Sequence, residues 1–93
     1  MVGVLTIQLH IPTCSSLKDK RHQLKPLVRR LHREFNVSAA EMGLNDNWKE
    51  AVIGCAMVGN ETAYLQSALS TVAKWVKANW PDGMVVDERI EVM

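Results

Sequence analysis

The spacing of apolar residues along the chain switches between two periods, and the order of these switches constrains the fold. Residues 2–11, VGVLTIQLHI, alternate apolar and polar side chains, which predicts a half-buried strand that Pro12 ends. From Leu17 to Phe35 the apolar residues recur every three or four positions, as in an amphipathic helix. Pro26 interrupts that segment, but the apolar residues stay in phase beyond it, so we expect one bent helix rather than two.

The rest of the chain continues this succession of strands and helices. Residues 36–43 predict a short strand, and the polar segment GLNDNW after it predicts a turn. Residues 50–59, EAVIGCAMVG, are apolar on both faces, which is typical of a central strand. Asn60 is expected to cap a second helix, and residues 84–92 predict a last strand with an acidic outward edge.

The resulting order, β-α-β-β-α-β, predicts a ferredoxin-like α+β sandwich: a four-stranded antiparallel sheet with two helices on one face. The first and third strands take the central places in this arrangement, as their apolar content suggests. We expect residues 1–93 to form a single domain, since chains of this length seldom divide. A domain this small has modest stability, so pairing with a copy or a partner would help it.

Most of the positive charge lies on the first predicted helix. Residues 15–33 hold seven of the eleven Lys and Arg against one acid, Asp19, although the whole chain has a formal net charge of only +1. At helical spacing, most of these cations and two histidines form one stripe turned away from the apolar face. No glutamate lies four residues away within that stripe to neutralise it. The stripe consists of Lys18, Arg21, His22, Lys25, Arg29, His32 and Arg33, while Lys20 and Arg30 fall outside it.

Two interpretations of this charge are open. It is either an ordinary solvated face, or a surface that contacts the phosphates of a nucleic acid. On the second interpretation the candidate nucleic-acid-binding residues are Lys18, Lys20, Arg21, Lys25, Arg29 and Arg33. The helix is expected to begin with Ser16 as its N-cap and Asp19 completing a capping box. The free backbone amides of Ser16, Leu17 and Lys18 would then suit a phosphate group.

The sheet offers a different kind of interface. The outward positions of the first and third strands carry no Phe, Tyr or Trp, so base stacking on the sheet is not expected. Because the third strand is apolar on both faces, a homodimer formed through the sheet face, or docking of a protein partner, is the alternative function. Trp48, in the polar turn, could stack on a base, but we expect it to fold back on the sheet edge.

Catalytic and metal sites have little support in the sequence. His10 and Cys14 supply too few ligands for zinc, so we expect no metal and no cofactor. Cys14 precedes a helix start and basic residues, conditions that lower a thiol pKa, which leaves a small-ligand sensor or enzyme as a third hypothesis. No nucleophile–base–orienter set is present, and we therefore expect no enzyme activity. Without a signal peptide or a membrane-length apolar run, a cytoplasmic protein with reduced thiols is expected.

Several segments resemble the YlxP-like family of small bacterial proteins, a family of unknown function. They are SLKDKR at 16–21, FNVSAAE at 35–41, the pair Asp46 and Trp48, and AVIGCAMVGN at 51–60. The resemblance implies a ferredoxin-like fold in a bacterial cytoplasm. It also implies RNA or ribosome work, because family genes often neighbour those of transcription elongation, translation initiation and a ribosome-binding factor. The family provides no established catalytic residues to transfer.

Overall fold

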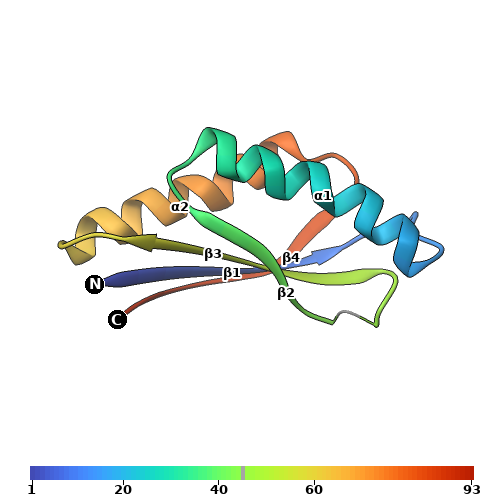
Figure 1. Ribbon diagram of the computed structural model, residues 1–93, viewed down its shortest axis with the longest axis horizontal. Helices are drawn as coiled ribbons and strands as arrows, with labels where there is room; N and C mark the ends of the chain where they lie inside the picture. The colour runs from blue at the N-terminus through green and yellow to red at the C-terminus, as the bar shows by residue number, and fades with distance from the viewer. Residues whose placement is uncertain (45) are drawn as a thin grey trace.

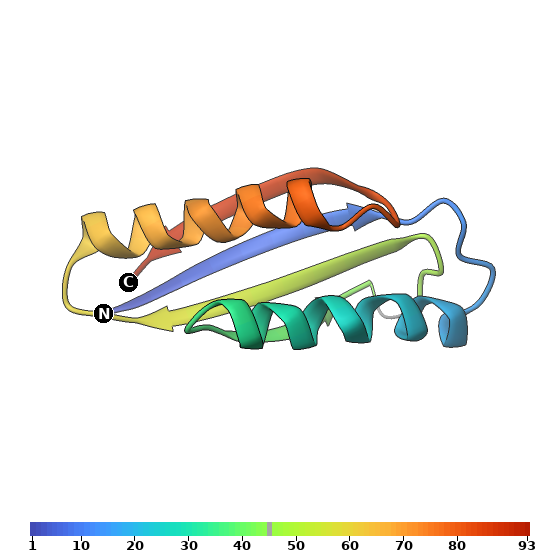
Figure 2. The same cartoon turned by 90° about the horizontal axis from the view of Figure 1, so that it is seen from above.

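The computed structural model describes residues 1–44 and 46–93, and its elements follow the predicted order (Figure 1). These are β1 Val2–His10, α1 Leu17–Glu34, β2 Ser38–Gly43, β3 Glu50–Val58, α2 Thr62–Asn79 and β4 Met84–Val92. All neighbouring strands pair antiparallel in the order β2-β3-β1-β4, so the first and third strands are central as predicted. Both helices cover the same face of the sheet, which confirms the ferredoxin-like α+β architecture (Figures 1 and 2).

The start of α1 confirms the predicted N-cap and changes one detail of it. Ser16 Oγ accepts a hydrogen bond from the Asp19 N–H at 3.0 Å. The Asp19 carboxylate accepts from the N–H of Ser15 at 3.2 Å, one residue before the cap, and not from Ser16 itself. The helix continues through Pro26, which is exposed, as the single helix that the apolar phase predicted. The predicted cap of α2 is wrong by one residue: Glu61 takes the cap position, and its side chain makes no capping hydrogen bond.

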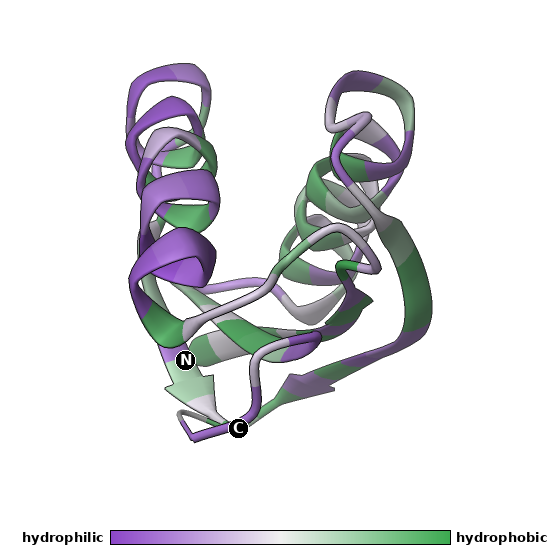
Figure 3. Cartoon of the chain, turned by 90° about the vertical axis from the view of Figure 1, so that its right-hand side faces the viewer, coloured by the Kyte–Doolittle hydropathy of each residue, from purple (hydrophilic) through white to green (hydrophobic). Residues whose placement is uncertain are grey.

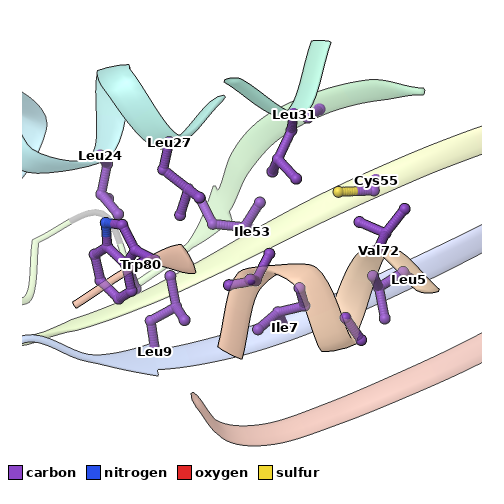
Figure 4. Close-up of a cluster of buried hydrophobic side chains, with 14 of the residues drawn as sticks. Leu5, Ile7, Leu9, Leu24, Leu27, Leu31, Ile53, Cys55, Val72 and Trp80 are labelled. Carbon is purple, nitrogen blue, oxygen red and sulfur yellow. The ribbon is translucent and has the colours of Figure 1, made fainter. Parts of the chain in front are cut away.

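The core lies between the helices and the sheet (Figure 4). Alternate residues of β1 and β3 point toward the helices, where the leucines of α1 and the apolar residues of α2 pack on them. Arg30, which falls outside the cationic stripe, joins the two helices. Its guanidinium lies 4.8 Å from the ring centre of Trp75 and donates to the carbonyl of Asn79 at 3.1 Å. Arg30 therefore has a structural role rather than a surface one.

The opposite face of the sheet carries no helix (Figure 3). Its central strip consists of Val4, Thr6, Gln8 and His10 from β1 and Glu50, Val52, Gly54, Ala56 and Val58 from β3. None of these residues is Phe, Tyr or Trp, as the sequence indicated. At one end His10 Nδ1 and Glu50 Oε1 lie 2.7 Å apart.

Positive and negative charge lie at opposite edges of the sheet. The basic helix α1 packs beside β2 at one edge, while β4 forms the other edge next to α2. The acids of β4, Asp87, Glu88 and Glu91, are exposed, which agrees with the predicted acidic outward edge. The near-zero net charge thus hides a separation of charge across the molecule.

Candidate nucleic-acid interface

The cationic stripe is present on the surface of α1. Lys18, Arg21, Lys25, Arg29 and Arg33 are all exposed. Within residues 1–44 and 46–93, none of the first four has a carboxylate within ion-pair distance. Arg33 meets only its neighbour Glu34, with Nε and Oε1 3.5 Å apart and both side chains largely exposed, so that pair is weak. The stripe is therefore not neutralised by the rest of the described chain.

Two shallow depressions follow the stripe. The first, of about 610 Å³, lies at the start of α1 and is lined by Ser15, Ser16, Lys18, Asp19, Arg21, His22 and Lys25. The second, of about 370 Å³, is lined by Arg21, Leu24, Lys25, Val28, Arg29 and Glu41. Because Glu41 belongs to β2, this part of the stripe lies on the flank of α1 that faces the edge of the sheet. At the far end of the helix, His32 Nε2 accepts from the N–H of Ala39, so His32 is tied to β2.

The predicted phosphate ligands at the start of α1 lie at the first depression, and the acidic residue Asp19 lies there too. Ser16 and Lys18 both line it, and Leu17 lies between them, partly buried. The first N–H groups of a helix have no acceptor within the helix, which suits them to an anion. Asp19 also lines this depression, so its carboxylate already supplies negative charge at this helix end. A phosphate there would depend on Lys18, Arg21 and Lys25 to offset that charge.

Lys20 does not belong to this interface, and its prediction as a phosphate ligand is wrong. Its side chain is 1% exposed, on the apolar face of α1 four residues before Leu24 and seven before Leu27. That spacing is visible in the sequence: it places Lys20 outside the stripe, and it should also have excluded Lys20 from the phosphate ligands.

The ammonium of Lys20 is fully used inside the protein. It donates to the carbonyl oxygens of Leu44, Asn47 and Glu50 at 2.8, 2.7 and 3.0 Å. Its three protons are thereby accounted for, and Glu41 Oε2, 2.9 Å away, is held by charge rather than by a directed hydrogen bond. Lys20 thus pins the connection between β2 and β3 to the first turn of α1.

A second lysine holds the same connection from its other side. Lys49 Nζ donates to the carbonyls of Pro12 and Cys14, at 2.7 and 3.0 Å, in the segment that leads into α1. Trp48 stands between these anchors and is 52% exposed. The prediction that Trp48 folds back on the sheet edge is therefore wrong, because an indole packed there would be largely buried.

Both cysteines belong to the hydrophobic core. Both side chains are fully buried. Burial, with a smaller contribution from Asp19, raises the pKa of the Cys14 thiol against the opposing effects of Lys49 and Lys20. This overturns the expectation that its position lowers the thiol pKa. Burial also raises the pKa of Cys55 to about 11.

Across residues 1–44 and 46–93 no three His, Cys, Asp or Glu residues come together in a group that could hold a metal ion. Neither α1 nor α2 is long and apolar enough to cross a membrane.

Comparison with known proteins points to a family without an assigned role. A family model described as "Protein of unknown function (DUF503)" matches residues 2–90. The chain is also similar to a protein of Bacillus subtilis (strain 168) described as "Uncharacterized protein YlxP". The two are 32% identical over 76 residues, which cover 82% of this chain and 83% of the relative. The chain therefore belongs to the DUF503 family.

Proposed function

We propose that this protein is a non-enzymatic, cytoplasmic RNA- or ribosome-associated protein that binds phosphates along α1. The observation that supports the proposal is the stripe of exposed cations, which the described carboxylates leave unneutralised. Like charges at helical spacing repel one another, so the stripe does not stabilise the fold. Binding of an anionic partner would neutralise these charges and remove their mutual repulsion, which favours the complex.

The dimensions of the stripe suit a nucleic-acid backbone. Lys18 and Arg33 lie fifteen positions apart on one helix, or about 22 Å at about 1.5 Å per residue. That length has room for four or five phosphate contacts. The proposed ligands are Lys18, Arg21, Lys25, Arg29 and Arg33, which would position the RNA without reading its sequence.

Charge reversal tests the proposal. We expect Arg21→Glu/Lys25→Glu/Arg29→Glu to lower affinity for a ribosomal RNA fragment by about 100-fold or more, because three phosphate contacts become repulsive. The control, Lys74→Glu/Lys77→Glu/Arg89→Glu, changes net charge equally but on α2 and β4, where Lys77 and Arg89 also lose their ion pairs with Glu88 and Glu91. Fluorescence anisotropy at fixed salt measures both. Equal affinity of the first variant and the unmodified protein, or equal losses in both variants, would contradict the proposal.

A second candidate function is association with another copy of this chain through the open sheet face. It is supported by the apolar outer side of β3, where Val58 is 77% exposed and Met42 of β2 lies over Gly54. A copy is the simplest occupant, because β4, beyond β1 at the edge of the same face, carries both Arg89 and the acids Asp87 and Glu91, which can pair with their opposites across a two-fold axis. Sedimentation equilibrium at high protein concentration tests this, and a strict monomer would contradict it.

A further inference from the structure

The loop between β2 and β3 is tightly held although it contributes little to the core. Its described residues, Leu44, Asp46, Asn47, Trp48 and Lys49, are all exposed. Loops of this kind are ordinarily mobile, since few buried contacts restrain them. In this loop, by contrast, several hydrogen bonds restrain residues that bury almost no apolar side chain.

Local backbone chemistry fixes the shape of the loop. Leu44 has φ of 57°, in the left-handed region that a branched apolar residue rarely adopts. Asn47 Oδ1 accepts from the N–H groups of Lys49 and Glu50, at 3.0 and 3.1 Å, which closes a tight turn around Trp48. Backbone strain of this kind persists where the surrounding structure demands it, and it is concentrated at functional positions.

The two lysine anchors add to this restraint. Burial of the Lys20 ammonium is unfavourable by itself, and its hydrogen bonds go to three carbonyls of this loop region. Lys49, next to Trp48, is bonded to the backbone before α1. These interactions hold the backbone on both sides of Trp48, at Asn47 and at Lys49, and the indole between them is exposed.

The loop lies at the same end of the molecule as the start of the stripe. Figures 1 and 2 both show the β2–β3 connection beside the beginning of α1. Two hydrogen bonds join the loop to this end of α1: the Lys20 ammonium donates to the carbonyl of Asn47, and the Lys49 ammonium donates to the carbonyl of Cys14. In the sequence, Cys14 and Lys20 flank Ser16 and Lys18, where the stripe begins. Hydrogen bonds on both sides of Trp48 thus tie it to the N-terminal end of α1, where the cationic stripe begins.

We propose that Trp48 is a stacking platform for an unpaired base of an RNA strand whose phosphates lie along α1. The inference rests on the proposed function. A half-exposed indole whose backbone is hydrogen-bonded on both sides provides a flat π surface, and bases stack on such surfaces without regard to sequence. The shallow depression around it, of about 350 Å³, also contains Asp46, Asn47 and Lys49. The Asp46 carboxylate disfavours a phosphate at this point, which leaves the base as the part of the nucleotide that fits.

The test compares probes with and without accessible bases. We expect Trp48→Ala to lower affinity for a single-stranded RNA 12-mer by about 5- to 150-fold. Affinity for inorganic polyphosphate and for a fully paired RNA duplex should remain unchanged, since neither offers an unpaired base. Trp48→Phe should retain most of the affinity, because a phenyl ring still stacks. Addition of the 12-mer should quench the fluorescence of the unmodified protein more than that of Trp48→Phe.

The possible failures are distinguishable. If Trp48→Ala binds the single strand as tightly as the unmodified protein while Arg21→Glu/Lys25→Glu/Arg29→Glu does not, the stacking inference is overturned and the proposed function stands. Equal losses for the single strand and for polyphosphate would also overturn it, since they indicate a disturbed loop and not a lost stack. If the unmodified protein binds no RNA, both the proposed function and this inference fail.

Discussion

Replacement of Lys20 by Met tests whether the buried ammonium holds the molecule together. Methionine matches the length of the lysine stem and suits the apolar face of α1, so the substitution removes the charge and leaves little cavity. It leaves the carbonyls of Leu44, Asn47 and Glu50 without this donor, and it leaves Glu41 without its cation.

The magnitude follows from the environment of the pair. Removal of one partner of a buried ion pair costs about 3–5 kcal/mol. Glu41 is 24% exposed, and water can reach part of the loop, so we place the loss near the lower end, at ~3 kcal/mol. For a domain of this size that corresponds to a fall in Tm of about 12–24 °C.

Urea denaturation followed by circular dichroism measures the loss, and calorimetry measures the shift in Tm. Lys18→Met is the matched control: it lies two residues away on the same helix but is exposed, so we expect a change within about 0.5 kcal/mol. Lys20→Met/Glu41→Gln should recover part of the stability, because the unpaired carboxylate is gone. If Lys20→Met loses less than about 1 kcal/mol, Lys20 does not pin the loop as described.

Three further outcomes are expected from the fold itself. Gly83→Ala should destabilise the protein by about 1–3 kcal/mol in urea denaturation, because a Cβ at this position would overlap the backbone carbonyl of His10, which cannot move aside as a side chain can. Ser16→Ala should cost about 1 kcal/mol in the same assay, since it removes the side-chain oxygen that caps α1. Cys14 and Cys55 should react with a thiol reagent at pH 8 only when the protein unfolds, because burial shields both thiols and raises their pKa. Rapid modification of either thiol in the folded protein would show that the buried, protonated state is wrong.

The elements of the fold were predictable from the sequence, because their apolar residues repeat with clear periods. Pro26 did not mislead the prediction of a single helix, since Leu27 and Leu31 continue the apolar phase beyond it. The cap of α2 was misplaced because Asn60 is a strong capping residue by type, whereas the helix begins one residue later without a side-chain cap.

The candidate site was only partly predictable. Helical spacing correctly located the exposed cations of the stripe and placed Lys20 outside it, but Lys20 was still counted among the phosphate ligands because of its charge alone. Its true role depends on carbonyl oxygens from residues 44–50, which are distant in sequence and carry no sequence signal. For the same reason the exposure of Trp48 could not be foreseen: it results from anchors to Lys20 and Cys14 that only the folded chain brings together.

The central claim is that exposed cations on α1 each contact a phosphate, and salt dependence tests it most directly. With four or five contacts, the logarithm of the RNA affinity should fall by about 3–4.5 for each tenfold rise in salt concentration. Arg29→Ala should reduce that slope by about 0.7–0.9, while Lys74→Ala, on α2, should leave it unchanged. An unchanged slope in Arg29→Ala, or equal reductions in both variants, would contradict phosphate binding along this helix.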